Sequence, residues 1–300
     1  MPPCCSVMTP GAVLLAQGYH PSAQIGIGMK DLRAAYGQYA LVTGASSGIG
    51  EQFARHLSAA GVNVILVARR KDRLETLATE LSRAHGTESL VLALDLLAEN
   101  AVDELARRVS NLDVGLVVAN AGISSAGPLV NSSLAYELDV LTLDAVVPLQ
   151  MAHVFGNAFV RRGRGAIVLV ASSLDASAVP YVANYSAAKA YVSSLGQALH
   201  YELKKDGVDV LVLSPGMTKT EITEKSFGLD PQKISGPRMT ASQVAEAALN
   251  NLGARARVIP GATNRATDLL VKHLIPRSLS AKMFGWLLGR ALIETAPHAS

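Results

Sequence analysis

The sequence has few of the residues from which metal sites, disulfide frameworks and nucleic-acid surfaces are built. Its 300 residues include only two cysteines, the adjacent pair Cys4 and Cys5. Neighbouring cysteines cannot form a disulfide framework, and they lack the spacing of metal ligands. The seven histidines are dispersed, with no pair at ligand spacing. We therefore expect no metal site, and the formal net charge of +3 gives no reason to expect nucleic-acid binding.

Long apolar runs are scarce as well. No stretch approaches the ~18 apolar residues that a membrane-spanning helix needs. The apolar run at residues 11–18 is short and has no basic residue before it, which argues against a signal peptide. Residues 1–35 contain scattered proline and glycine and are interpreted as an N-terminal extension. These absences favour a cytoplasmic protein.

Strand-like and helical patterns alternate along most of the chain. Continuous runs of Val, Ile and Leu predict strands covered on both faces, at residues 39–42, 62–69, 89–96, 114–122, 165–173 and 208–216, with a last strand near 258–259. Helical patterns lie between them, at residues 71–84, 98–110, 135–162, 181–205 and 241–252. This order predicts an α/β fold with one doubly wound parallel sheet of the Rossmann type, helices on both faces. The domain is expected over residues 36–263, with extensions at 1–35 and 264–300.

The first predicted strand runs into a glycine-rich turn, TGASSGIG, that precedes a helical stretch. The candidate binding residues there are Gly44, Ser46, Ser47, Gly48, Ile49 and Gly50. Glycines allow the backbone to approach a pyrophosphate, and a helix N-terminus attracts its negative charge. The spacing is T-G-x-x-x-G-x-G rather than the G-x-G-x-x-G dinucleotide fingerprint. Taken alone, these glycines also fit an ordinary strand-to-helix turn.

A second motif combines Tyr185, Lys189 and Ser172, the serine lying thirteen residues before the tyrosine. Residues four apart share one face of a helix, so the lysine charge is expected to lower the tyrosine pKa from its ordinary value of about 10. The phenol then exchanges a proton with a carbonyl oxygen that the serine hydroxyl also holds. Tyr201 and Lys205 repeat the four-residue spacing without such a serine, and we interpret them as surface residues.

These motifs together resemble the short-chain dehydrogenase/reductase family over residues 36–263. The resemblance implies an oxidoreductase in which Tyr185 is the general acid and base, Lys189 also binds the nicotinamide ribose, and Ser172 orients the carbonyl oxygen. It further implies cofactor contacts at the strand ends. Those residues are Asp95 and Leu96 at the adenine, Asn120, Ala121 and Gly122 after the fourth strand, and Pro215, Gly216, Thr218 and Thr220 at the nicotinamide and phosphates.

One position departs from the family pattern. The family usually has an asparagine in the long helix before the fifth strand, where it helps to hold a water that relays protons to the lysine. The matching position, 28 residues before Ser172 and 24 after Asn120, is Asp144. Aspartate keeps the oxygen acceptors but loses the amide donor, and it brings a charge near Lys189. The alternative is that the register is wrong and Asp144 is not the position that matches the family asparagine. If it is the matching position, the departure affects the proton relay more than the activity.

The end of the second predicted strand bears on the choice of cofactor. Enzymes that use NAD place an acidic residue there to accept hydrogen bonds from the ribose hydroxyls. This chain has Ala68 followed by Arg69 and Arg70. A guanidinium pairs with a 2′-phosphate, so the sequence predicts NADP as the cofactor, with Arg69 as the arginine that meets the phosphate. The competing interpretation is a solvated arginine pair at a helix start.

The sequence therefore predicts an NADP-dependent oxidoreductase that interconverts a ketone or aldehyde and its alcohol, similar to ketone, 3-oxoacyl and steroid reductases. An epimerase or dehydratase on the same scaffold, or a catalytically weak dinucleotide-binding protein, are the alternatives. The long connection at residues 217–240 and its apolar residues suggest a lid over an apolar substrate. Residues 264–292 mix apolar and basic residues, which fits packing on the core, a contact in a homo-oligomer, or peripheral membrane contact.

Overall fold

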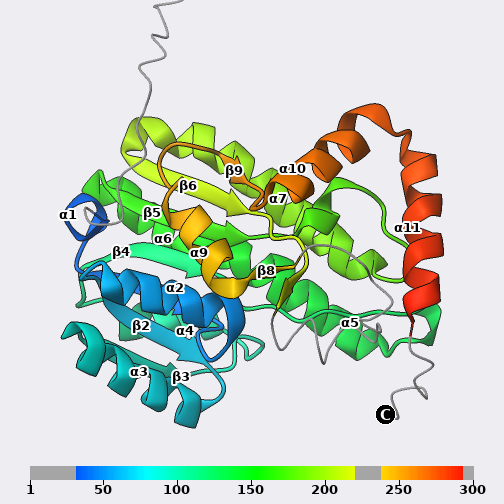
Figure 1. The fold of residues 1–300 in the computed structure, drawn as a ribbon. Helices are drawn as coiled ribbons and strands as arrows, with labels where there is room; N and C mark the ends of the chain where they lie inside the picture. Colours follow the sequence, from blue (N-terminus) through cyan, green and yellow to red (C-terminus); the bar gives the residue numbers. More distant parts are fainter. Residues whose placement is uncertain (1–31, 220–237, 293–300) are drawn as a thin grey trace, which may run out of the picture.

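A seven-stranded parallel sheet forms the centre of the computed structural model, which describes residues 32–219 and 238–292 (Figure 1). The strand order is β3-β2-β1-β4-β5-β6-β9. The strands are β1 (Tyr39–Thr43), β2 (Asn63–Ala68), β3 (Ser89–Ala93), β4 (Val114–Ala119), β5 (Gly165–Val170), β6 (Val208–Leu213) and β9 (Arg257–Val258). This order reverses direction next to β1, which confirms the predicted doubly wound sheet.

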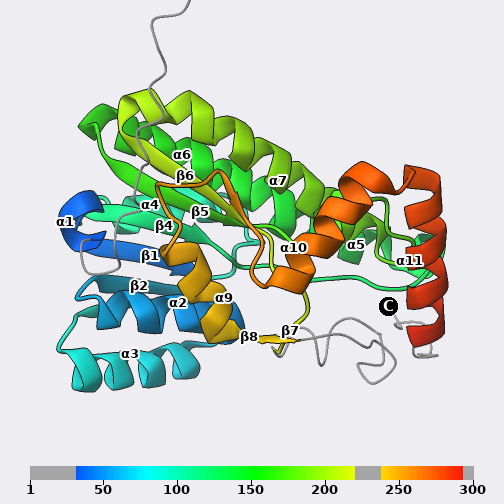
Figure 2. The ribbon, with the colours of Figure 1, turned by 45° about the horizontal axis from the view of Figure 1, so that its top comes forward.

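Helices cover both faces of the sheet. One face packs against α1 (Leu32–Tyr36), α2 (Gly48–Ala59), α3 (Lys71–His85) and α9 (Ala241–Leu249). The other face packs against α4 (Ala101–Arg108), α7 (Ala183–Leu203) and a long helix made of α5 (Leu134–Leu141), η3 (Thr142–Val146) and α6 (Val147–Arg162). Figure 1 and Figure 2 show these two layers with the sheet between them.

The alternation of side chains along β1 explains why its sequence is apolar throughout. Ala40 and Val42 join the core under α2 and α9, whereas Leu41 joins the core on the opposite face. Successive residues of a strand point to opposite faces, so a strand covered on both sides needs apolar residues at every position. The continuous apolar runs were therefore correct predictors of parallel strands, but the run at residues 89–96 forms the edge strand β3, where only Leu92 is buried, because an edge strand has a neighbour on one side only.

The first helix, α1, begins before the predicted domain boundary at residue 36. Residues 32–35 were assigned to the N-terminal extension, but they form most of α1, and Leu32 is buried in the core. The Tyr36 hydroxyl donates a hydrogen bond of 2.8 Å to an Asp209 carboxylate oxygen in β6. This bond ties the start of the described chain to the far half of the sheet.

The C-terminal extension packs onto the domain as two helices. They are α10 (Ala262–Leu269), continued by the π-helical segment η6 (Leu270–Leu274), and α11 (Arg277–Ala291). Leu288 and Ala291 of α11 form a small apolar cluster with Val179 and Val182, which precede α7. Figures 1 and 2 both place α11 at the opposite end of the molecule from α1.

The predicted lid is described only at its two ends. There, β7 (Thr218–Lys219) pairs in parallel with β8 (Met239–Thr240) as a separate two-stranded sheet. Residues 220–237, and with them the predicted cofactor residue Thr220, lie outside the described part of the chain. Short 3-10 turns complete the fold: η2 (Leu129–Asn131), η4 (Ser173–Ala176) and η5 (Lys204–Asp206).

Within the described residues, one helix is long and apolar enough to cross a membrane by length and composition, the segment Leu134–Arg162. It is the α5–η3–α6 helix, and Leu143, Val147, Met151 and Phe155 along it are part of the core under the sheet. A helix of this length in the core of a protein meets the same criterion as a membrane-spanning helix. Its packing under the sheet therefore accounts for its apolar sequence.

Candidate active site

The predicted site residues come together along the edge of the sheet where the parallel strands end. The glycine-rich turn follows β1, Asn120 follows β4, Ser172 follows β5 and Pro215 follows β6. Because parallel strands present their carboxyl ends at one edge, loops that are distant in sequence become neighbours there. The convergence predicted from the sequence pattern is therefore present in the fold (Figure 1).

Contacts with Asn120 force glycine at two positions of the glycine-rich turn. Gly44 has φ +67°, and a Cβ there would lie 2.7 Å from the Asn120 side-chain nitrogen. A Cβ at Gly50 would overlap the Gly44 carbonyl oxygen and lie 2.5 Å from the same nitrogen. Asn120 is held in place because its amide donates to the Thr43 carbonyl at 2.9 Å. The Asn120 side chain thus braces the turn and accounts for glycine at both positions, and the turn leads into the N-terminus of α2, a type of site that attracts phosphate.

Thr43 is a site residue that the sequence analysis did not single out. Its hydroxyl oxygen accepts hydrogen bonds from the backbone nitrogens of Asn120 and Ala121, at 2.9 and 3.0 Å, and donates to the Val118 carbonyl at 3.3 Å. These bonds join the end of β1 to the end of β4. The threonine of TGASSGIG was visible as part of the motif, but its partners lie 75 to 78 residues away, so spacing alone gave no signal.

Arg70, rather than Arg69, reaches the glycine-rich turn. Its guanidinium donates to the Ser46 hydroxyl at 2.9 Å and to the Ser47 hydroxyl at 2.8 Å. Arg69 is exposed at the same strand end. A half-buried guanidinium with two hydroxyls beside bare glycine backbone and the start of α2 is an anion-binding arrangement. The residues present therefore fit a phosphorylated dinucleotide.

The remaining predicted cofactor residues lie around the same edge. Asp95 is exposed after β3 and accepts a hydrogen bond from the Leu97 backbone, whereas Leu96 is buried. Gly216 packs so closely on Asn264 of α10 that a Cβ would lie 2.5 Å from its amide nitrogen. The Thr218 hydroxyl is buried and donates to the Gly216 carbonyl at 2.9 Å. Asn264 is thus a further residue at this edge, supplied by the C-terminal extension.

Ser172, Tyr185 and Lys189 meet where β5 and α7 approach each other. Ser172 lies two residues after the end of β5 and caps η4, its hydroxyl accepting from the Leu174 backbone at 3.2 Å. Tyr185 and Lys189 lie one turn apart near the start of α7, with the ammonium nitrogen 5.7 Å from the tyrosine ring centre. The second tyrosine–lysine pair is different, because Tyr201 is 76% exposed at the other end of α7. Its interpretation as a surface pair agrees with this position.

Asp144 lies directly against Lys189. Its Oδ1 atom is 3.4 Å from the Lys189 ammonium, and both side chains are buried, at 0% and 5% exposure. The same oxygen accepts from the Ile123 backbone at 3.2 Å, and a Cβ at Gly122 would overlap it. Its Oδ2 atom is buried and has no hydrogen-bond partner among the described residues. The register derived from spacing therefore brings the aspartate to the lysine.

A local break in the helix places Asp144 there. Residues Thr142–Val146 form a π-helical segment between α5 and α6. Pro148 follows four residues after Asp144, and because proline has no N–H, it cannot donate to the Asp144 carbonyl. Such π segments arise where the regular ladder is interrupted and frequently occur at functional sites. The proline thus explains the widened turn that carries the aspartate.

The pKa of Tyr185 shifts in the direction opposite to the one expected from the charge of Lys189. Burial raises the pKa of Tyr185 above its ordinary value, the negative charge of Asp144 raises it further, and the hydrogen bond with Ser172 lowers it. Burial also raises the pKa of Asp144 to about 6, although the Lys189 charge opposes this shift. The expected lowering of the tyrosine pKa by Lys189 is not observed, because Asp144 offsets the lysine charge and burial penalises the phenolate.

Comparison with known proteins identifies the family. Residues 38–228 match the family model for the short chain dehydrogenases. The chain belongs to this family. A 7beta-hydroxysteroid dehydrogenase of Clostridium sardiniense is 31% identical over 235 residues, which cover 78% of this chain and 90% of that protein. The protein is therefore an oxidoreductase of the type that transfers hydride with a nicotinamide dinucleotide.

Solved structures of the family give the same result. One, from a study of 7beta-hydroxysteroid dehydrogenase stereoselectivity, superposes with a TM-score of 0.78 and 26% identity, covering 85% of this chain and 99% of its own. A short-chain dehydrogenase from Sphingobium yanoikuyae in complex with NADPH has a TM-score of 0.69 and 27% identity, covering 87% and 98%. These likenesses extend over most of the chain.

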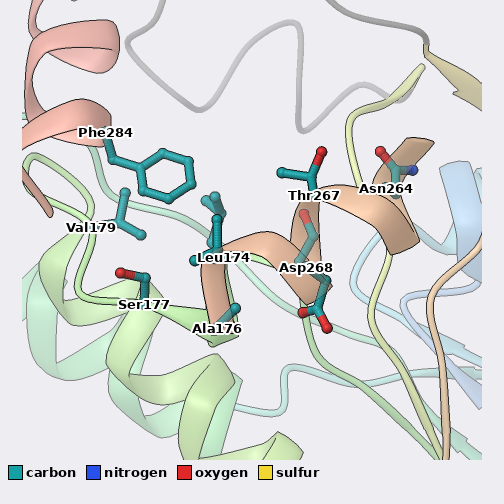
Figure 3. Close-up of a pocket in the computed structure, with 10 residues that line it drawn as sticks. Leu174, Ala176, Ser177, Val179, Asn264, Thr267, Asp268 and Phe284 are labelled. Atoms are coloured by element: carbon teal, nitrogen blue, oxygen red, sulfur yellow. The ribbon is translucent and has the colours of Figure 1, made fainter. Parts of the chain in front are cut away.

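A cavity lies beside the family motif, between the loop after Ser172 and the C-terminal helices. Its volume is about 90 Å³. Figure 3 shows Leu174 and Val179 on one side and Phe284 of α11 near them, with Thr267 and Asp268 of α10 opposite. Typical ligand pockets measure roughly 300–1,000 Å³, so the cavity fits part of a substrate rather than the whole of one.

A buried ionic network holds this side of the site together. The Arg257 guanidinium pairs with Asp175 at 2.5 Å and with Asp268 at 3.0 Å, and it donates to the Ser214 hydroxyl at 3.0 Å. Ser214 in turn donates to Asp175 at 2.8 Å. Asp175 lies three residues after Ser172 and Asp268 lies in α10, so the network fixes the C-terminal extension to the serine loop. The sequence analysis did not single out this network, and the only local signal for it is an acidic residue three positions after Ser172.

Proposed function

We propose that this dehydrogenase is an NADP-dependent oxidoreductase that interconverts a ketone or aldehyde and the matching alcohol, with Tyr185 as its acid and base. The observation that supports this most is the arrangement of Ser172, Tyr185 and Lys189 at the same sheet edge as a glycine-rich turn whose Ser46 and Ser47 contact Arg70. The test is to follow NADPH absorbance with a panel of ketones, 3-oxoacyl thioesters and hydroxysteroids. NADPH oxidation with any member of that panel supports the proposal. The absence of NADPH oxidation with every member contradicts it.

The proposed chemistry assigns one task to each side chain. The bound nicotinamide dinucleotide supplies hydride to the carbonyl carbon in reduction. Tyr185 donates its phenolic proton to the carbonyl oxygen as negative charge develops there, so that the oxygen becomes a hydroxyl. The Ser172 hydroxyl donates a second hydrogen bond to that oxygen and orients it. Lys189 stabilises the tyrosinate left behind, and in alcohol oxidation Tyr185 takes the proton back.

The raised pKa of Tyr185 favours the reductive direction. A proton donor must be in its neutral form, and a phenol whose pKa exceeds its ordinary value is neutral at every pH below about 10. Alcohol oxidation needs the tyrosinate, which burial and Asp144 disfavour. The direction of this pKa shift therefore supports the role of Tyr185 as the proton donor in carbonyl reduction.

The proposed preference for NADP rests on the arginines after β2. Arg70 lies on Ser46 and Ser47 at the turn, and Arg69 is the exposed neighbour that the sequence analysis favoured. Both are close to Ala68, where an enzyme that uses NAD carries an acid. An apolar substrate is supported more indirectly, by the apolar side chains around the cavity and by the hydroxysteroid relatives.

Arg70→Ala is expected to lower kcat/KM for NADPH by about 10- to 100-fold, because a charge-assisted contact contributes ~1.5–3 kcal/mol. Removing the arginine also frees Ser46 and Ser47, but that change affects both cofactors, so the decisive measurement is the NADPH to NADH ratio of kcat/KM. Arg69→Ala is the matched variant that shows which arginine binds the phosphate. Adding Ala68→Asp is expected to move the preference further toward NADH. A wild type that prefers NADH would refute the assignment.

Homo-oligomer formation is proposed from the long helix opposite α2. Leu134, Leu138, Leu141 and Leu149 along α5 and α6 are each at least 39% exposed. Scattered exposed leucines are ordinary, but a row along one helix marks an interaction surface. Light scattering is expected to give a mass that is a multiple of the 31.4 kDa protomer, and Leu134→Ser with Leu138→Ser is expected to lower it. A monomeric wild type at micromolar concentration would be evidence against this contact.

A catalytically weak dinucleotide-binding protein is the second candidate, and the Asp144–Lys189 pair favours it. A carboxylate at 3.4 Å neutralises the lysine that the tyrosine depends on. The two functions differ in one measurement, since a scaffold binds NADPH but does not oxidise it with any carbonyl compound. An epimerase or dehydratase activity is not supported by any feature of the site.

A further inference from the structure

The C-terminal helices present two different faces. On α11, Ser280, Phe284 and Leu288 point toward the domain: the Ser280 hydroxyl lies 2.7 Å from the Ser177 hydroxyl, Phe284 lines the cavity and Leu288 is buried. The helix also approaches the loop before α7 closely, since Cβ atoms at Gly285 and Gly289 would lie 3.2 Å from Pro180 and Tyr181. This face is anchored, so the opposite face is held in a fixed orientation.

The opposite face of α11 carries large apolar side chains in the open. Leu279, Met283 and Trp286 are 56%, 41% and 63% exposed. Together with Arg290 they are spaced at i, i+4, i+7 and i+11, which places them on one stripe of the helix. The Arg290 guanidinium lies 4.5 Å from the Trp286 ring centre and stacks on it. In the segment just before α11, at the end of α10 and in η6, Leu269, Leu270 and Leu274 are exposed as well.

The segment that carries these apolar side chains contains basic residues and no acidic ones. Residues 269–292 contain Lys272, Arg277, Lys282 and Arg290 and no acidic residue, in a chain with 24 acidic residues overall. Asp268, just before them, is buried and paired with Arg257 and Lys272. Six exposed large apolar side chains among four cations, with tryptophan among them, match the surface of an anionic bilayer, whose headgroups attract cations and whose interface accommodates indole rings.

We propose that the exposed face of α10, η6 and α11 binds the surface of an anionic lipid bilayer. A second copy of the chain fits this face less well, because a two-fold contact would bring its four cations against the same four cations of the partner. The helices lie on the surface and do not cross it, since their inner sides pack on the cavity and on the loop before α7. The proposal does not depend on the substrate or on the cofactor.

The only tryptophan of the chain, Trp286, makes the test direct. Vesicles of phosphatidylcholine with about one third phosphatidylserine are expected to shift its emission to shorter wavelength, and brominated acyl chains are expected to quench it. Pure phosphatidylcholine and high salt are expected to weaken binding at least tenfold, because each cation near an anionic surface contributes ~1 kcal/mol, or about fivefold. Lys282→Glu is expected to weaken it similarly.

The variant Leu279→Ser with Met283→Ser keeps the probe and removes two apolar anchors, so it is expected to lose most of the binding. The matched control is Tyr201→Ser, which removes an exposed aromatic side chain near the C-terminal end of α7 and is expected to bind normally. Three results would overturn the proposal: no shift with any vesicle, a lipid-free emission already at short wavelength, or a shift that depends on protein concentration without lipid. The last would indicate a second copy as the occupant.

Discussion

Tyr185→Phe is expected to lower the turnover of any carbonyl substrate by about 10²- to 10⁴-fold, the usual effect of losing a general acid. The change removes only the phenolic oxygen, so the α7 backbone and the buried ring stay in place. NADPH binding is therefore expected to remain close to that of the wild type. The two measurements are the steady-state rate and a titration of NADPH fluorescence.

The chain provides a matched control for this experiment. Tyr201 also precedes a lysine by four residues on the same helix, but it is 76% exposed at the far end. Tyr201→Phe is expected to retain the full rate, which shows that the spacing alone has no effect. If Tyr185→Phe kept most of the wild-type rate, the proposed mechanism would be wrong.

Asp144→Asn is expected to move the pH profile of alcohol oxidation to lower pH, by roughly one pH unit or more. The Asp144 charge is the second cause of the raised Tyr185 pKa, after burial. Asparagine keeps the size and an acceptor oxygen but removes the charge, so the tyrosinate forms at lower pH. The measurement is kcat/KM for both directions across the pH range.

The sign of this effect depends on pH. The pKa of Asp144 is raised to about 6, so its charge is present above that pH and lost below it. Wild type and Asp144→Asn are therefore expected to behave alike below pH 6 and to diverge above it. The same shift means that Asp144 contributes most to folding stability below its unfolded pKa of about 3.9, and that this contribution is lost as the pH rises through 6. Profiles that coincide across the whole range would show that the position is only structural.

Asp144→Leu separates charge from packing at this position. It leaves the Lys189 ammonium buried with the Val170 carbonyl, at 3.2 Å, as its remaining hydrogen-bond acceptor. Removing one partner of a buried ion pair costs about 3–5 kcal/mol, so we expect a lower unfolding midpoint and little activity. Asp144→Asn serves as its control, since it keeps an oxygen near the lysine.

Local patterns in the sequence determined the fold class. Continuous apolar runs at β1, β2 and β4 to β6, separated by helical patterns, admit few arrangements other than a parallel sheet covered on both faces. The same reasoning placed the glycine-rich turn, Ser172 and Tyr185 at one edge of the sheet. The spacing argument also assigned Asp144 to the position beside Lys189, where the structure places it at 3.4 Å.

Only the tertiary structure decided the electrostatics of the site and the exposure of its surroundings, because both depend on groups that are distant in sequence. The direction of the Tyr185 pKa shift follows from burial and from Asp144, 41 residues earlier, which outweigh a lysine one turn away. Only the fold shows that Arg70, and not Arg69, contacts the Ser46 hydroxyl. Arg257 pairs with Asp175, 82 residues earlier, and with Asp268, and the two faces of α11 are distinguished by what packs against each. Local sequence determines the conformation of a turn, a strand or a helix. The pKa of a side chain and its exposed fraction depend on all the neighbours that folding brings together.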